Sequence, residues 1–261
     1  MKFCNINFNQ KNIAECFERS DKDKLKFIIT VNAVFIVEAN TSRRFFDILN
    51  SNYVVFDGKI PHLAAKIFNP ERRKSKKKFD FEKLSGSDIV YDFCDFAKKN
   101  NYKIFFLGGQ TESNSVAVNN VREQYNVMID GYSPKFETYP FSEQFNNACL
   151  KKIAYFKPDI LFVGFGAPKQ EYWIDDNMEF LTKAGVKYAI GSGGTFDFVS
   201  KKIKRAPVFI QKTGLEGVFR FFQEPNKIRF KRLVDSYKFF KYIRCSPDCV
   251  KRLETISEFT K

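Results

Sequence analysis

The residues best suited to bind an anionic substrate lie in one segment, residues 157–198. It contains two short apolar runs, DILFVGFG and YAIGSGG, and each ends in glycines that polar residues follow. In an open α/β sheet, ligands bind outside the carboxyl ends of the parallel strands, where backbone N–H groups and polar loop residues converge. We therefore expect Gln170, Glu171 and Asp197 to lie at such a binding edge.

Glycines at strand ends allow the backbone to approach a nucleotide or diphosphate closely. Three apolar runs, KIFFL, DILFV and YAI, are followed by glycines, but none forms a G-x-G-x-x-G pattern, so a nicotinamide dinucleotide site is not supported. Each glycine taken alone is more often structural than ligand-binding. The candidate anion-binding glycines are Gly108, Gly109, Gly164, Gly166, Gly193 and Gly194, with Gln170 and Asp197 as the main polar partners and Lys169 and Glu171 in reserve.

Longer motifs follow one another in a fixed order. TVNAVFIVEA, VVFDG, SGSDIV and IFFLGGQTESN precede GFGAPKQEYWI, GSGGTFDF, KRAP and GLEGVFRFFQEP. Together they resemble the WecG/TagA/CpsF family of bacterial glycosyltransferases over roughly residues 25–240. The resemblance implies transfer of a sugar from a UDP-sugar, the donor, to an undecaprenyl-diphosphate-linked sugar at the cytoplasmic face of the membrane. It also implies inversion at the anomeric carbon and no metal or other cofactor.

Asp57 follows the run NYVVF and precedes Gly58, so its carboxylate should lie at the mouth of the sheet. A carboxylate within hydrogen-bond reach of a sugar hydroxyl can take its proton as the hydroxyl attacks. The resemblance gives that role to Asp57, although local sequence alone would favour a simple turn.

Thr30 and Asn32 match the family's T-x-N motif. Alternation along an extended segment puts both side chains on one side, where they could bind a sugar or orient Asp57, whereas without the family they would more often be turn residues.

Guanidinium groups are expected to meet the charge of the leaving diphosphate, because their planar donors pair well with phosphate. The resemblance places Lys83 where the family usually has an arginine, and lysine keeps the charge but loses the bidentate fork. Gly217 replaces a large aromatic residue in GLEG, which puts the packing of that helix in doubt. A solvated helix face is a rival explanation for the arginines, Arg229 in particular. The arginines in the family's matching C-terminal motifs are Arg205, Arg220, Arg229 and Arg232.

No metal site is expected. Metal-dependent sugar transferases commonly present aspartates at D-x-D spacing, whereas Asp92 with Asp95 and Asp175 with Asp176 fall in helix-like segments. The six cysteines form no C-x-x-C pair, and the single histidine, His62, cannot complete a zinc set. Reduced thiols in a cytosolic compartment are the natural interpretation.

The composition is compatible with the peripheral position at the cytoplasmic face of the membrane that the resemblance implies, although it could not have supplied that position. The chain of 261 residues is 44% hydrophobic, which is enough for a substantial core. Its start does not read as a signal peptide, and no window approaches the ~20 apolar residues of a membrane span. Residues 201–261 hold 16 Lys and Arg against 6 Asp and Glu, or +10 of the chain's net +14.

Aromatic residues alternate with these C-terminal charges, which suits an anionic membrane surface. The residues expected to insert are Phe219, Phe221, Phe222, Phe239 and Phe240. An ordinary solvated helix with its aromatics on the core is a rival, and nucleic acid is not expected because no recognised motif supports it. A second basic cluster, PERRKSKKK at residues 70–78, is expected to be an exposed loop that could attract anionic headgroups.

Alternating strand-like and helix-like segments predict an α/β fold, with a Rossmann-like, mostly parallel sheet and flanking helices. KFIITVNA, YVVFDG and KIFFLGG are expected strands; FIVEANTSRRFFDILN, YWIDDNMEFLTKAG and TESNSVAVNNVREQY are expected helices. SKKIKRAP interrupts the pattern with charge and a proline. We predict a catalytic core at residues 1–200 and a basic helical appendage at 201–261 that completes the active site.

The sequence therefore favours an inverting, metal-independent transferase that acts in surface polysaccharide or teichoic-acid synthesis. N-acetylmannosamine and other hexoses are open as the transferred sugar, and a homo-oligomer is compatible with the sequence. A catalytically inactive, membrane-associated scaffold is the main alternative, which Lys83 and Gly217 favour and an intact Asp57, Thr30 and Asn32 oppose. A nucleotide-binding enzyme with another chemistry comes third.

Overall fold

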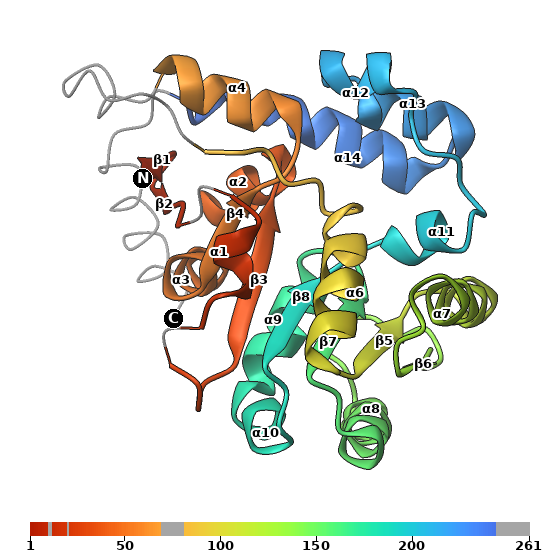
Figure 1. The fold of residues 1–261 in the computed structure, drawn as a ribbon. Helices are drawn as coiled ribbons and strands as arrows, with labels where there is room; N and C mark the ends of the chain where they lie inside the picture. Colours follow the sequence, from red (N-terminus) through yellow and green to blue (C-terminus); the bar gives the residue numbers. More distant parts are fainter. Residues whose placement is uncertain (10–11, 20, 69–80, 244–261) are drawn as a thin grey trace. The chain divides into compact units, whose positions relative to one another are not determined.

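The computed structural model describes residues 1–9, 12–19, 21–68 and 81–243 (Figure 1). The basic cluster at residues 70–78 lies outside these described ranges. The strands are β1 (Lys2–Phe3), β2 (Ile6–Asn7), β3 (Lys26–Val31), β4 (Tyr53–Phe56), β5 (Ile104–Gly108), β6 (Ile129–Tyr132), β7 (Ile160–Gly164) and β8 (Tyr188–Gly191).

The helices alternate with the strands until β8 and then follow one another to the end of the described chain. They are α1 (Ala14–Phe17), α2 (Ala33–Ala39), α3 (Arg43–Ser51), α4 (Lys59–Phe68), α6 (Ile89–Asn100), α7 (Thr111–Tyr125), α8 (Glu143–Phe156), α9 (Lys169–Asp176), α10 (Met178–Lys183), α11 (Thr195–Val199), α12 (Val208–Thr213), α13 (Glu216–Gln223), α14 (Lys227–Lys238) and the 3-10 helix η1 (Phe239–Lys241).

The strands form a six-stranded sheet in the order β4-β3-β8-β7-β5-β6, and β1 pairs with β2 as a separate antiparallel hairpin. The pairs β3–β8, β8–β7, β7–β5 and β5–β6 are all parallel. The predicted α/β fold with a mostly parallel sheet, flanking helices and C-terminal helices is confirmed. The chain divides into two compact units: unit 1 contains Met1–Glu15, Ile29–Ser85 and Arg205–Lys261, and unit 2 contains Cys16–Ile28 and Gly86–Lys204.

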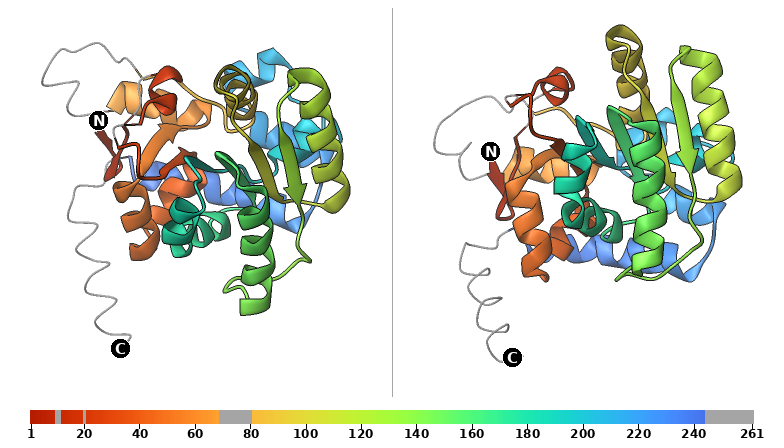
Figure 2. Two further views of the ribbon diagram at one scale, coloured as in Figure 1. Left: turned by 60° about the horizontal axis from the view of Figure 1, so that its bottom comes forward. Right: turned by 90° about the horizontal axis from the view of Figure 1, so that it is seen from below.

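In unit 2 the core is the central strands, whose residues are almost completely buried. The strand β5 is buried along its whole length, and Phe106 on β5 pairs in register with Phe162 on β7. From β5 the chain moves outward to β6 and then returns to β7, so right-handed crossovers put α7 and α8 on opposite faces of the sheet. Figures 1 and 2 show these helices on either side of the strands.

In unit 1, α2, α3 and α4 accompany the end of β3 and β4, and the C-terminal helices join them. The helix α14 packs against α2, and α12 packs against α4. Phe239 is fully buried, and its ring lies 6.3 Å from that of Phe3. The prediction that Phe239 inserts into a membrane is therefore wrong, because its side chain belongs to the core of unit 1.

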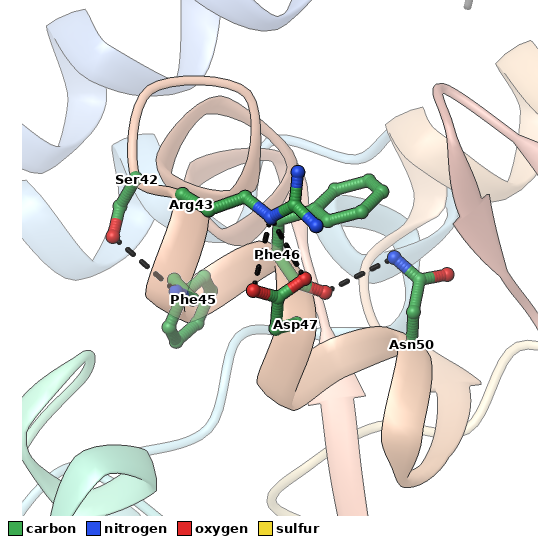
Figure 3. A network of polar contacts seen from close by, with 6 residues as sticks. All are labelled: Ser42, Arg43, Phe45, Phe46, Asp47 and Asn50. Atoms are coloured by element: carbon green, nitrogen blue, oxygen red, sulfur yellow. Dashed lines mark hydrogen bonds and ion pairs between the residues drawn. The ribbon is translucent and has the colours of Figure 1, made fainter. Parts of the chain in front are cut away.

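The single helix predicted for FIVEANTSRRFFDILN is wrong, because the structure has two helices, α2 and α3. Asn40 ends α2, and its Nδ2 donates to the carbonyl of Ile36 at 2.7 Å. Ser42 then begins α3, because its Oγ accepts the N–H of Phe45 at 3.3 Å (Figure 3). Short polar side chains compete with the helix for backbone hydrogen bonds, so the polar run Asn-Thr-Ser ends one helix and begins another.

The helix predicted for YWIDDNMEFLTKAG is likewise two helices, α9 and α10, which meet at Asn177. The Nδ2 of Asn177 donates to the carbonyl of Trp173 at 2.8 Å, so a side chain replaces part of the helical ladder there. Trp173 and Leu181 are buried, whereas Met178 is only half-buried. Asp92 and Asp95 lie on α6, and Asp175 and Asp176 on α9, as expected.

Candidate active site

Unit 1 contains a pocket of about 290 Å³ whose lining brings together five of the residues selected from the sequence. They come from the ends of two neighbouring strands and from the C-terminal helices: Asn32, Asp57, Arg220, Arg229 and Arg232. With Glu216 and Lys59, which also line the pocket, the lining combines two carboxylates, an amide, an ammonium and three guanidinium groups.

Asp57 lies directly after β4, at the carboxyl end of the strand. Its backbone N–H donates to the carbonyl of Val31, the last residue of β3, at 2.9 Å. Gly58 follows with φ at +86°, a conformation that residues with a side chain rarely adopt, and α4 begins at the next residue. The turn thus ends the strand abruptly and leaves Asp57 at the pocket.

Asn32 caps the helix that begins after β3. Its Oδ1 accepts the N–H groups of Val34 at 3.0 Å and Phe35 at 3.3 Å. That oxygen is therefore engaged in holding α2, and the Nδ2 group is the part of the side chain left to face a ligand. Thr30 is only 6% exposed and is absent from the described residues that line the pocket, so the structure brings Asn32 but not Thr30 to it.

The three arginines of the pocket come from α13 and α14. Asn226 caps α14 by accepting the N–H of Arg229 at 2.9 Å, and the Arg229 guanidinium pairs with Glu224 at 2.9 Å. The solvated helix face considered for Arg229 is not what the structure shows, because its side chain is 18% exposed. Arg220 and Arg232 complete the basic wall.

Arg205 and Lys83 are absent from the described lining of the pocket. They belong to the same unit, and each makes a polar contact within it. A terminal nitrogen of Arg205 donates to Ser85 Oγ at 3.2 Å. Burial lowers the pKa of the Arg205 guanidinium, while the nearby carboxylates of Glu216 and Asp57 act in the opposite direction. Lys83 Nζ lies 3.1 Å from Glu216 Oε1, so in this structure its partner is a carboxylate.

The rest of the pocket is largely apolar. Its wall is formed by side chains from α4, α13, α14 and η1 and by the residue before α13, some of them half exposed: Ile60, Leu215, Val218, Leu233, Tyr237 and Phe240. Sequence reasoning assigned no site role to this wall or to Glu216, although GLEGVFRFF contains part of both. The sequence signal for this wall was the spacing of apolar residues in the same C-terminal helices that carry the arginines.

Gly217 leaves the helix α13 intact and opens the pocket. It lies in the first turn of α13, and a Cβ added there would meet only Leu233 Cδ1, at 3.9 Å. A large aromatic residue at this position would occupy part of the pocket. The sequence put the packing of this helix in doubt. The structure shows that α13 forms and that there is space beside Gly217.

The glycines predicted to approach an anion lie in unit 2. Aromatic rings occupy the space that a side chain would need at several of them. A Cβ at Gly108 would lie 2.8 Å from Phe165, and one at Gly109 would lie 2.9 Å from Phe196. A Cβ at Gly164 would lie 2.7 Å from the same Phe196 ring. These three glycines therefore have a packing reason for the absence of a side chain, whereas no described atom would lie within 4 Å of a Cβ at Gly193.

Gln170 ties two of these loops together. Its Oε1 accepts the N–H of Gly166 at 3.1 Å and of Gly193 at 3.0 Å, while its Nε2 donates to Glu171 at 2.7 Å. Gln170 is 2% exposed and Glu171 is fully buried, so both side chains support the loops from within. Direct contact between Gln170 and a donor stays a prediction.

The remaining residues of this set lie at helix starts. Gly194 caps α11, Asp197 is a half-buried residue within that helix, and Lys169 begins α9. The Lys169 ammonium lies 5.0 Å from the centre of the Phe136 ring. The structure thus divides the predicted site residues between the pocket of unit 1 and the loops of unit 2, and their roles stay predictions.

Three further observations concern metal ions, cysteines and membrane spans. Within the described ranges, no group of three or more His, Cys, Asp or Glu side chains is arranged to hold a metal ion. Cys4, Cys16, Cys94 and Cys149 are buried, and none of these four is in a disulfide. In the same part of the chain, every helix is too short or too polar to cross a membrane.

Comparisons with known proteins agree with the motifs. The chain is 30% identical over 214 residues to the N-acetylglucosaminyldiphosphoundecaprenol N-acetyl-beta-D-mannosaminyltransferase of Bacillus subtilis (strain 168), covering 81% of this chain and 76% of that protein. Proteins of the same name in Bacillus spizizenii (27% over 221 residues, covering 84% of this chain and 79% of that protein) and Staphylococcus aureus strain MRSA252 (26% over 213 residues, covering 80% and 76%) are also similar. The model of the glycosyl transferase WecG/TagA/CpsF family matches residues 1–246. The chain belongs to this family of glycosyltransferases.

Proposed function

We propose that this protein transfers a sugar from a UDP-sugar to an undecaprenyl-diphosphate-linked sugar, with inversion and without a metal ion. The observation that carries the proposal is the pocket in which Asp57 lies with Arg220, Arg229 and Arg232 beside an apolar wall. The names of the similar Bacillus and Staphylococcus proteins give the acceptor class and make N-acetylmannosamine the first sugar to test.

Asp57 is the proposed general base. The acceptor hydroxyl oxygen attacks the anomeric carbon of the donor while its proton passes to the Asp57 carboxylate. The bond between the anomeric carbon and the diphosphate oxygen breaks, and UDP leaves with the electron pair. A single displacement of this kind attacks from the face opposite the leaving group, so the anomeric configuration inverts. Asn32 Nδ2 is the proposed donor to a hydroxyl of the bound sugar.

The arginines are proposed to meet the charge that develops on the leaving diphosphate. A guanidinium presents several N–H donors in a plane and retains its proton even when half-buried. Three such groups in one pocket, with Arg205 close to Asp57, supply positive charge from side chains alone. This arrangement supports a mechanism that needs no divalent cation.

The apolar wall fits a lipid-linked acceptor. An undecaprenyl chain needs apolar surface next to its charged diphosphate, and the pocket offers Leu215, Tyr237 and Phe240 beside the basic residues. A free sugar acceptor would have no use for exposed side chains of this kind. The nucleotide contacts expected of the unit 2 loops at Gly166 and Gly193, which Gln170 fixes, stay a separate prediction.

Membrane contact is proposed at the C-terminal helices, from the cytoplasmic side. The exposed apolar side chains in this part of the chain include Phe209, Leu215, Phe222, Phe230, Tyr237 and Phe240, set among lysines and arginines. Apolar insertion and attraction to anionic lipids would act together there. Phe222 and Phe240 from the sequence prediction remain suitable, and Phe209 and Phe230 join them.

A screen of UDP-sugars against a short-chain lipid-diphosphate sugar acceptor tests the proposal. Release of UDP that depends on both substrates, with an inverted anomeric centre in the product, is expected with at least one donor. No turnover with any donor, despite measurable binding of donor and acceptor, would favour an inactive scaffold. Turnover that needs the nucleotide but not the lipid acceptor would favour another chemistry.

A further inference from the structure

The segment of residues 81–85, here called the strap, ties together separate elements of unit 1. The carbonyl of Phe81 lies 2.6 Å from His62 Nε2 on α4, and the N–H of Leu84 donates to the carbonyl of Phe56 at 2.9 Å. Ser85 Oγ accepts from Arg205, and Lys83 pairs with Glu216 at the start of α13. The strap is therefore anchored at the end of β4, one residue from Asp57, and reaches the helix that carries Arg220.

The position of Glu216 on α13 makes this contact relevant to the pocket. Glu216 and Arg220 are four residues apart, so they lie on the same face of the helix. Both line the pocket that contains Asp57. An ion pair that holds Glu216 also holds the first turn of α13, and Arg220 follows one turn later on the same helix.

The Lys83–Glu216 pair is better placed to orient than an ordinary surface pair. The two side chains are only 20% and 35% exposed, so solvent screens them incompletely. The backbone next to Lys83 is anchored through Leu84, and Glu216 lies in the first turn of α13, so both partners extend from fixed backbone. Most exposed pairs lack this support and contribute little.

We propose that Lys83 is a positioning residue, which acts through Glu216 to hold Arg220 in place beside Asp57. This inference rests on the proposed function for its catalytic consequence. The sequence predicted that Lys83 contacts phosphate directly. In the present proposal its partner is a carboxylate, and it affects catalysis only through Arg220.

The test is a double-mutant cycle on turnover with Lys83→Met, Arg220→Ala and the two combined. Because misplacing a catalytic group costs much of its effect, Lys83→Met should lower kcat about ten- to a hundredfold and change the KM of the donor far less. The combined variant should be no slower than Arg220→Ala alone. Lys83→Arg, which keeps the charge, should restore kcat to near the wild-type value.

Losses that multiply in the combined variant would overturn the proposal and favour a direct contact between Lys83 and substrate. A wild-type kcat in Lys83→Met would also overturn it. The control is Lys187→Met, which removes a pair of matching exposure, Lys187 with Asp159 at 2.7 Å in unit 2. Its kcat should stay near wild type once the folded fraction is taken into account.

A second cycle, in urea, keeps this inference separable from the proposed function. Lys83→Met, Glu216→Gln and their combination report the coupling between the two side chains without any turnover. A swapped pair is avoided because a lysine at position 216 would lie near Arg205. If the two side chains show no coupling in urea, the positioning role is rejected even if the enzyme is active. If the wild-type protein has no turnover, the proposed function is rejected, and the urea cycle still tests whether Lys83 and Glu216 are coupled.

Discussion

The backbone N–H of Asp57 donates to the carbonyl oxygen of Val31 at 2.9 Å, which joins the first residue after β4 to the last residue of β3. The residue that follows Val31 is Asn32, whose side chain caps α2. Two strand ends and one helix start are thus tied to each other within a few residues. Asp57 is placed by the backbone of the sheet, so a change to its side chain should leave its surroundings in place.

Asp57→Asn should therefore abolish most of the activity and leave the fold intact. Asparagine keeps the shape of the side chain but cannot accept the proton of the acceptor hydroxyl, so turnover should fall by about two to four orders of magnitude. The measurement is kcat beside thermal unfolding and UDP binding, both of which should change little. Asp47→Asn, on the exposed pair with Arg43 in α3, is the matched control (Figure 3). Turnover of Asp57→Asn within a few-fold of wild type would remove it from the role of base.

Arg220→Ala should reduce turnover strongly, and chelation should not. Removal of one donor that stabilises developing charge costs about two to three orders of magnitude in kcat, whereas excess EDTA should leave the rate unchanged. Arg43→Ala, which removes an exposed guanidinium on α3, is the control for a general loss of positive charge. Loss of activity in EDTA with rescue by magnesium or manganese would contradict the mechanism.

The fold could be predicted from the sequence where the pattern was strong. Apolar runs such as KIFFLGG and DILFVGFG gave β5 and β7 close to their observed ends, and α7 has the predicted bounds. The edge strand β6 was missed because IDGY contains an aspartate and a glycine and only Ile129 is buried. The hairpin β1–β2 was missed because Cys4 and Asn5, both with positive φ, form its turn without a glycine.

The site could be predicted only in part, for a physical reason. Asp57 and Asn32 follow strands, and a strand end locates a side chain well. Lys83 and Gln170 were also selected, but each has an observed partner that is distant in sequence. Lys83 pairs with Glu216, and Gln170 accepts the N–H of Gly193. Residue type reveals what a side chain can bind, whereas only the fold determines which partner it meets.

Gln170→Leu should destabilise the protein. The leucine removes the acceptor for the N–H groups of Gly166 and Gly193, and an unsatisfied buried donor costs about 1–3 kcal/mol. The free energy of unfolding in urea should fall accordingly, and UDP affinity should fall with it if the loops bind nucleotide. Gln124→Leu, at an exposed position on α7, should change neither quantity. A wild-type stability for Gln170→Leu would show that water replaces the lost acceptor.

Gly164→Ala and Gly217→Ala should change stability in opposite directions. A methyl group at Gly164 would lie 2.7 Å from the Phe196 ring, so about 1–3 kcal/mol should be lost to overpacking. At Gly217 the nearest atom is 3.9 Å away and the residue is helical, so alanine should add up to about 1 kcal/mol. Urea unfolding of both variants tests the pair. Equal stability would mean that Phe196 shifts freely and that its contact does not require a glycine.

The membrane contact can be tested without truncation, which would strip the buried Phe239 from the core of unit 1. Phe222→Ser combined with Phe230→Ser changes two rings that are 75% and 57% exposed, and both lie within about 6 Å of Phe221. In co-sedimentation with anionic vesicles, wild-type binding should have a part that high salt removes and a part that it does not, because charges are screened and inserted rings are not. The double variant should lose the salt-resistant part and keep the salt-sensitive one. Phe136→Ser, which changes a ring in unit 2 that is 83% exposed, controls for the loss of any exposed aromatic. If the control loses the salt-resistant part and the double variant does not, the inserted surface lies in unit 2 and not on the C-terminal helices.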